Sequence, residues 1–273
     1  MTTTEDSAPT ADAWIAALRQ AHDQLADLVR GLDADGLARP SACSDWDVAQ
    51  VLGHLGSAAE IGAATLDAAL AGTDGPGPDF NQPVWDRWNA LDNQAKAAGF
   101  QEQAGNLVAA YEALDPATRA DLRVKLPFFP EPIDVATLVR LRTSELAHHG
   151  WDVRVGFDST ATLHPAAVDL MIDHSGDFLA YIGKADRFEG GPATIMVETT
   201  DPARSYALTI ADAVSLAPAP PEGAAGADAT LRLPAESWLR LIYGRLPPEH
   251  TPADVTLTGA ITLDDLRRVF PGV

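Results

Sequence analysis

Residues 145–152 place a carboxylate, Glu145, and an imidazole, His149, four residues apart in a pattern typical of a helix. Positions i and i+4 lie one turn apart on the same face of a helix, so both side chains can bind one ion. His54, in an earlier helical pattern, offers a third ligand. Structural zinc sites usually have all four positions filled by protein. The sequence therefore predicts an open, chemically active metal site formed by His54, Glu145 and His149.

The polar stripe around this pair has a second interpretation. Ionisable groups on a buried helix face are costly unless they are paired or bound to metal. A stripe that faces solvent carries no such cost, and His54 lies on a largely apolar helix where a satisfied core histidine would suffice. The stripe consists of residues about one turn apart, namely Leu138, Arg142, Glu145, His149 and Asp152.

Three neighbouring side chains define the limits of the predicted site. His148 is rotated by about 100° around the helix from His149, so we do not expect it to share the ion of Glu145. Asp152, three residues after His149, could orient that imidazole by a hydrogen bond to the ring nitrogen that does not bind the metal. Cys43 precedes the helix of His54 and has no histidine beside it in sequence. We expect Cys43 to be a packing residue and not a nucleophile.

Composition restricts the partners of the protein. The 273 residues suffice for one large or two medium domains, and 46% hydrophobic with 21% charged residues is ordinary for a globular protein. A formal net charge of −20 argues against nucleic acid and anionic membrane partners. The single cysteine excludes an internal disulfide and Cys-based zinc motifs. Residues 1–6 lack the pattern of a signal peptide, and no apolar run is long enough for a membrane span, so we expect a cytoplasmic protein.

The elements that must position these residues differ between the two halves of the chain. Apolar periodicity and capping signals predict four helices in the first half. They cover residues 11–32, a stretch that begins at the capping residues 44–47 and runs to about 70, 84–114 and 134–155. Residues 72–83 are predicted to form a loop. The second half predicts a mixture of strands and helices, with a loop over 218–226: strands 193–200, 204–210, 229–233 and 255–258, helices 164–182, 235–243 and 263–270. We therefore predict an α+β protein with a metal-binding four-helix bundle, residues 1–157, and an α+β domain, residues 158–273.

Residues 41–48, leading to His54, resemble the first half of the signature of mycothiol-dependent maleylpyruvate isomerases, and residues 145–152 resemble its second half. These proteins belong to the DinB-like superfamily of metal-binding four-helix bundles. The resemblance implies that His54, Glu145 and His149 bind a divalent metal, usually zinc, and that mycothiol is the thiol cofactor. Residues 233–245 and 258–260 resemble the carboxy-terminal domain of the family, which is similar to a sterol-carrier-protein fold. Ala260 stands where relatives often carry Asp, so we assign it no role.

The resemblance implies a function, the cis–trans isomerisation of an enoyl diacid by reversible thiolate addition. An anionic substrate needs a fixed cation, and we predict that Arg245, after the turn residue Gly244, binds it in a cleft between the domains. The alternative is a surface arginine in a salt bridge. Two other functions stay open, a mycothiol S-transferase or detoxifying enzyme and a non-enzymatic protein that binds a metal and a small ligand. We expect a monomer or a small homo-oligomer.

Overall fold

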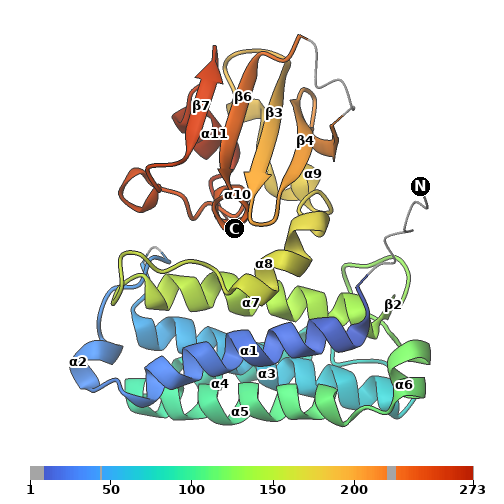
Figure 1. Cartoon of the computed structure of the whole chain (residues 1–273). Coiled ribbons are helices and arrows are strands. Elements are labelled where there is room, and N and C mark those ends of the chain that lie inside the picture. The colour runs from blue at the N-terminus through green and yellow to red at the C-terminus, as the bar shows by residue number, and fades with distance from the viewer. Residues whose placement is uncertain (1–8, 44, 220–225, 273) are drawn as a thin grey trace. The chain divides into compact units, whose positions relative to one another are not determined.

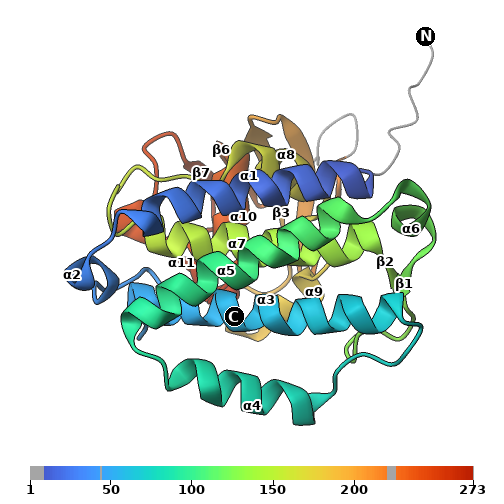
Figure 2. The same cartoon turned by 90° about the horizontal axis from the view of Figure 1, so that it is seen from below.

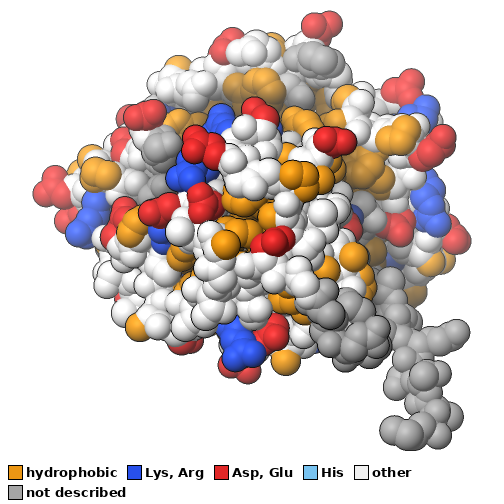
Figure 3. All heavy atoms as spheres, turned by 90° about the horizontal axis from the view of Figure 1, so that it is seen from above, with side chains coloured by type: hydrophobic (Ala, Val, Ile, Leu, Met, Phe, Trp, Pro, Cys, Tyr) orange, Lys and Arg blue, Asp and Glu red, His pale blue; other side chains and the backbone are white. Residues whose placement is uncertain are grey.

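The computed structural model describes residues 9–43, 45–219 and 226–272. The chain divides into two compact units, Met1–Ala167 and Val168–Val273. The domain boundary that we predicted after residue 157 stays a prediction. None of the described helices combines the length and the apolar character that crossing a membrane requires. On the face in Figure 3, acidic and basic side chains are interspersed with apolar ones.

Four long helices form the body of the first unit (Figures 1 and 2). They are α1 (Ala11–Arg30), α3 (Val48–Leu70), α5 (Asn93–Ala113) and α7 (Val135–Arg154). Helix α3 packs against α5 and α7, and α1 packs against α7 and α5. Their contact surfaces bury large side chains, among them Trp14, Leu52, Phe100 and Trp151. The predicted four-helix bundle is confirmed.

Capping side chains determine where the two helices of the predicted site begin. The Asp47 carboxylate accepts a hydrogen bond from the Gln50 N–H at 2.7 Å, and Gln50 Oε1 accepts one from the Asp47 N–H at 2.9 Å. Asp134 caps α7 by accepting from the Thr137 N–H at 2.8 Å. The predicted cap of α3 covered residues 44–47, of which Ser44 lies outside the described residues. A fixed start sets the rotational position of every later side chain on the helix.

The prediction of one helix over residues 84–114 was wrong, because the chain forms two helices there. Helix α4 (Pro78–Asn89) occupies part of the predicted loop, and Asp92 caps α5 by accepting from the Ala95 N–H at 2.8 Å. Figure 2 shows α4 outside the four long helices. A Cβ atom on Gly56 or Gly99 would lie 2.2 or 2.7 Å from the Trp88 ring. These two glycines therefore let the Trp88 indole pack close to α3 and α5.

Shorter elements connect the long helices of the first unit. Two strands pair antiparallel before α7. The short elements of this unit are α2 (Ala34–Leu37), α6 (Pro116–Asp121), β1 (Arg123–Val124) and β2 (Ile133–Asp134).

The second unit is built on a five-stranded sheet in the order β5-β4-β3-β6-β7. Strands β3 and β6 pair parallel and the other pairs are antiparallel. The strands are β3 (Ala193–Thr200), β4 (Arg204–Ile210), β5 (Val214–Pro218), β6 (Ala229–Pro234) and β7 (Thr256–Gly259). Helices α10 and α11 lie behind the sheet in Figure 1. The α+β fold class is confirmed, and the likeness to sterol carrier proteins stays a prediction.

Two details of the second unit differ from the prediction. Strand β5 was missed, and Pro218 at its end was placed in a loop whose residues 220–225 lie outside the described residues. The predicted helix over residues 164–182 is interrupted around Gly176, where the chain turns. The helical pieces of this half are α8 (Pro165–Met171), η1 (Ile172–His174), α9 (Leu179–Ile182), η2 (Ala185–Arg187), α10 (Ala235–Ile242), η3 (Pro248–His250) and α11 (Leu263–Val269).

Candidate metal centre

Of the three predicted ligands, His54 on α3 lies beside each of the two on α7, Glu145 and His149. His54 Nε2 is 3.0 Å from Glu145 Oε1, and the rings of His54 and His149 meet edge to face with centroids 4.8 Å apart. The His54 and Glu145 side chains are 33% and 29% exposed. A small molecule can therefore reach these donors, although most of their surface is covered by protein.

Arg142 holds one oxygen of the Glu145 carboxylate. Its Nη1 donates to Glu145 Oε2 at 2.6 Å, and its Nη2 donates to the Leu55 carbonyl of α3 at 2.6 Å. Burial raises the pKa of Glu145, but the charge of Arg142 and the hydrogen bond from His54 oppose it and bring that pKa to about 2. Glu145 is thus a carboxylate at neutral pH. Arg142, engaged with Glu145 and Leu55, is poorly placed to bind a substrate carboxylate.

Asp152 lies within hydrogen-bond distance of the His149 ring, and the orienting role that we predicted for it stays a prediction. His149 Nδ1 and Asp152 Oδ2 are 2.9 Å apart, and the Asp152 side chain is fully buried. A carboxylate on one ring nitrogen sets the tautomer and directs the other nitrogen, here Nε2, toward a ligand. The neighbouring His148 is 3% exposed and its Nδ1 lies 2.7 Å from the Ser144 carbonyl of its own helix.

Trp46 forms an aromatic contact with both histidines, which the sequence analysis missed. Its ring centroid lies 5.3 Å from that of His54 and 6.3 Å from that of His149. Trp46 belongs to the short segment before α3. The signal in the sequence was its place two residues before the start of that helix, next to the capping Asp47.

Cys43 lies nearer to the predicted site than its place in the sequence indicated. One ligand atom each of Cys43, His149 and Asp152 lies within 4.8 Å of the other two. Cys43 and His149 are partly exposed and Asp152 is buried. The packing role that we expected for Cys43 stays a prediction. A contact between residues so far apart in the chain has no local signal in the sequence.

Arg245 lies in the second unit, after a turn that requires glycine. Gly244 has φ +73°, and a Cβ there would lie 2.3 Å from the Gly272 nitrogen. The Arg245 N–H donates to the Arg240 carbonyl at 2.7 Å, and its Nη1 donates to the Tyr243 carbonyl at 2.9 Å. Arg245 is 8% exposed, which differs from the alternative of a surface arginine. Its role toward a substrate stays a prediction.

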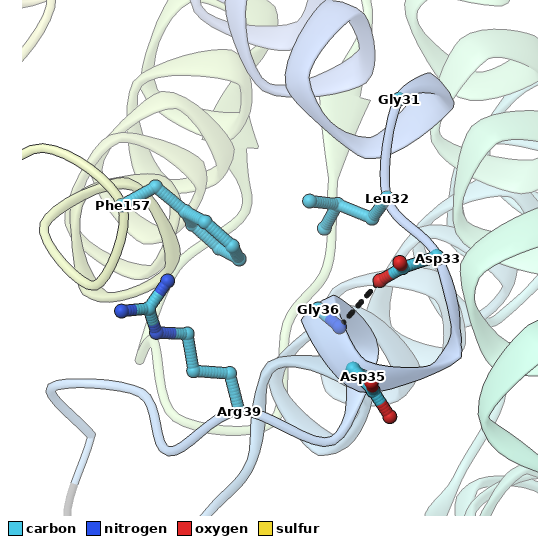
Figure 4. A pocket seen from close by; sticks show the side chains of 7 residues that line it. All are labelled: Gly31, Leu32, Asp33, Asp35, Gly36, Arg39 and Phe157. Carbon is cyan, nitrogen blue, oxygen red and sulfur yellow. Dashed lines mark hydrogen bonds between the residues drawn. The ribbon is translucent and has the colours of Figure 1, made fainter.

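A surface pocket near α2 contains none of the predicted site residues (Figure 4). The Arg39 guanidinium carbon lies 5.1 Å from the centroid of the Phe157 ring, and Leu32 faces that ring from the other side of the pocket. Asp33 at its rim accepts a hydrogen bond from the Gly36 N–H at 2.9 Å, which caps α2. Two charged residues of this pocket, Arg39 and Asp33, therefore have partners that stabilise the local fold.

Comparison with known proteins gives matches over both units. The family profile for the mycothiol maleylpyruvate isomerase N-terminal domain matches residues 18–154, and the profile for the MDMPI C-terminal domain matches residues 167–263. A crystal structure of the mycothiol-dependent maleylpyruvate isomerase superposes with a TM-score of 0.65 at 12% identity, covering 96% of this chain and 98% of that one. A histidine-to-alanine mutant of that enzyme gives a TM-score of 0.66 with the same identity and coverage. No curated protein matches. At this identity, the structural likeness shows the fold alone.

Proposed function

Because the chain belongs to the mycothiol maleylpyruvate isomerase family, we propose that it is a metal- and mycothiol-dependent isomerase of the maleylpyruvate isomerase type. The proposed reaction is the cis–trans isomerisation of an enoyl diacid by reversible addition of a thiolate. The observation that carries the proposal is the juxtaposition of His54, Glu145 and His149, with partly exposed donors on two helices.

The donor set fits a divalent cation, with zinc as the first candidate. Two imidazoles and one carboxylate are ligands that zinc takes in catalytic sites, where a further position stays open. Glu145 is ionised, and the bond between His149 Nδ1 and Asp152 directs the other ring nitrogen of His149 away from Asp152. The ion would replace the hydrogen bond between His54 Nε2 and Glu145 Oε1, because both atoms would become its ligands.

A bound cation would supply positive charge that stabilises the thiolate form of a small thiol near neutral pH. The residues of the chain prepare the site for it. Arg142 holds Glu145 so that a single carboxylate oxygen faces His54. Asp152 holds the His149 ring, and Trp46 packs against both imidazoles. Glu145 offsets one unit of the charge of a dication, so the site stays cationic until an anionic sulfur binds.

The thiol, when bound, would supply a nucleophilic sulfur that adds to the double bond and leaves after rotation about the resulting single bond. The diacid must approach that sulfur inside a protein of net charge −20, which requires a local cation. Arg142 is engaged with Glu145, and we propose that Arg245, which also donates to the Tyr243 carbonyl, binds the substrate carboxylate. The planar guanidinium binds carboxylates in a bidentate manner.

A coupled measurement on the purified full chain tests the proposal. The protein is supplied with zinc, mycothiol and maleylpyruvate, and both isomerisation and the free thiol concentration are followed. We expect turnover that requires mycothiol, consumes none of it, and is lost with a chelator and regained with zinc. Stoichiometric loss of thiol would identify an S-transferase. Metal binding without any turnover of thiol or substrate would contradict an enzymatic role in this reaction.

A further inference from the structure

The two candidate histidine ligands are held in different ways. Nδ1 of His149 lies 2.9 Å from an oxygen of the buried Asp152 carboxylate. None of the residues that the structure describes forms a hydrogen bond with Nδ1 of His54, whose other ring nitrogen, Nε2, lies 3.0 Å from Glu145 Oε1. A histidine that binds a metal almost always donates its second ring N–H to a partner that sets the orientation of the ring. The orientation of His54 therefore depends on contacts of another kind.

The Trp46 indole supplies such a contact. Its centroid lies 5.3 Å from that of the His54 ring at an interplanar angle of 48°, and 6.3 Å from that of the His149 ring at 26°. Both distances are typical of packed ring pairs. One indole thus contacts a candidate ligand on α3 and another on α7. The terminal torsion of a histidine side chain is broad by itself, and a flat ring packed against the imidazole restricts it.

The backbone of Trp46 has a fixed position before α3. The Trp46 N–H donates to the Cys43 carbonyl at 3.2 Å, and the Trp46 carbonyl accepts from the N–H and the Oγ of Ser41 at 3.0 and 2.9 Å. Asp45, the preceding residue, has φ +68°, which is uncommon for a residue other than glycine. Such a conformation persists where the surrounding structure determines it strongly. The indole therefore meets the two imidazoles from a backbone that is held on both sides.

We propose that Trp46 is the positioning residue of His54 and holds the imidazole so that Nε2 stays directed at the ion. The proposal rests on the proposed function, because it presupposes a cation bound by His54, Glu145 and His149. That ion would replace the hydrogen bond between His54 Nε2 and Glu145 Oε1, which then no longer orients the ring. Packing against Trp46 would do for His54 what we predict that the hydrogen bond of Asp152 does for His149.

The zinc affinity of full-chain variants, measured by competition with a chromogenic chelator, tests the proposal. Trp46→Leu keeps an apolar side chain but has no flat face, and it should weaken zinc binding by about tenfold. Trp46→Phe restores a ring and should stay within about threefold of the wild type. Trp85 on α4, which is 42% exposed, is the matched control, and Trp85→Leu should leave the affinity unchanged. Equal affinities of wild type and Trp46→Leu would overturn the proposal.

A second background separates positioning of His54 from a general effect on the fold. In His54→Ala the indole has no imidazole at position 54 to hold, so adding Trp46→Leu should change the remaining zinc affinity by no more than about twofold. The same loss in both backgrounds would mean that Trp46 acts through the fold or through His149, and would refute the proposal.

The wild-type protein gives a readout that needs no variant. With zinc bound, nuclear Overhauser effects between the indole protons of Trp46 and the ring protons of His54 should persist, because the proposed contact is kept in the loaded site. Loss of these effects on zinc binding would also overturn the proposal. A wild-type protein that binds no zinc would instead refute the proposed metal site itself.

Discussion

Each unit of the protein contains an arginine–glutamate pair on one helix, and the two pairs leave very different atoms available. In α10, Arg240 Nε and Nη2 donate to the two oxygens of Glu236 at 2.7 and 2.9 Å, and Arg240 is 1% exposed. In α7, Arg142 Nη1 donates to one oxygen of Glu145, and the other oxygen lies 3.0 Å from His54 Nε2. Glu236 is thus bound at both oxygens by its arginine, whereas Glu145 keeps one oxygen for a second group.

A carboxylate paired with arginine can therefore stabilise the fold or stay available to a ligand. Arg240 also donates to the His250 carbonyl at 3.0 Å and the Arg245 carbonyl at 3.2 Å, so it stabilises the chain that follows α10. Bidentate pairing in a buried setting gives a rigid structural element. Pairing at one oxygen leaves a carboxylate that is ionised, oriented and partly exposed, which is what a metal ligand requires.

The largest expected effect is the loss of the structural pair. Arg240→Ala should lower the free energy of unfolding by about 3–5 kcal/mol, because it leaves the Glu236 charge buried without its partner. Urea denaturation of the full chain measures this. The exposed pair of Arg232 and Glu198 is the matched control, and Arg232→Ala should cost no more than about 1 kcal/mol. Equal losses in the two variants would contradict the structural role of Arg240.

The next effect separates two adjacent histidines of the first unit. His149→Ala should weaken zinc binding by more than about 100-fold. Losing a residue that only hydrogen-bonds to a metal ligand already costs up to about 100-fold in affinity, and losing the ligand itself should cost more. His148→Ala should largely keep the metal, since the Nδ1 of His148 lies against the Ser144 carbonyl. Metal content after dialysis and competition with a chromogenic chelator measure both. Equal losses in the two variants would mean that the wrong histidine was assigned.

A smaller effect tests whether Arg245 of the second unit binds the substrate. Arg245→Ala should lower kcat/KM. The loss of transition-state stabilisation calculated from the two kcat/KM values should be about 1.5–3 kcal/mol, the scale of a charge-assisted hydrogen bond. Metal content should not change, because no predicted ligand lies in this unit. Steady-state kinetics at saturating mycothiol provide the measurement. Unchanged kinetics would show that Arg245 does not bind the substrate.

The smallest effect concerns two tyrosines, one in each unit, and is seen only at high pH. Burial raises the pKa of Tyr111 and of Tyr206 to about 12. Their stabilising contribution is complete below the unfolded-state pKa of about 10 and is lost as the pH rises toward 12. Tyr111→Phe should reduce the loss of stability between pH 9 and 11.5, measured by urea denaturation at each pH. A wild-type stability that does not fall over this range would contradict the raised pKa values.

Tyr206→Phe is the variant in the second unit that matches Tyr111→Phe in the first. Tyr206→Phe should reduce the alkaline loss in the same direction. It should also cost about 0.5–1.5 kcal/mol at neutral pH, because the Tyr206 hydroxyl donates to the Ile172 carbonyl at 3.1 Å.

Local signals explain what the sequence could predict. The long helices α1, α3 and α7 follow from periodicity and from caps such as Asp47 and Asp134, which act within a few residues. The first half of α4 was predicted as a loop because its Gly- and Pro-rich start and the internal Pro83 resemble one. The position of α4 depends on Trp88 packing against two distant helices, and such contacts leave no pattern in a short window.

The same limit applies to the site. Glu145 and His149 were predicted from their spacing on one helix and His54 from its place in an earlier helical pattern, and the family resemblance implies the same three residues. The bond of Arg142 to the Leu55 carbonyl and the proximity of Cys43 to His149 join segments far apart in the chain. The packing of α3, and of the segment before it, against α7 brings these atoms together, and periodicity does not specify that packing.

The origin of the predicted ligands on two helices, α3 and α7, has a thermodynamic consequence. An ion that binds the folded bundle and not the unfolded chain adds to its stability by mass action, about 2.7 kcal/mol at 100 times its Kd. An ion bound by the predicted ligands would therefore act as a removable cross-link between helices that are remote in sequence. The melting temperature of the bundle then reports ion affinity without any substrate, so cations can be ranked by thermal shift before the reaction is assayed.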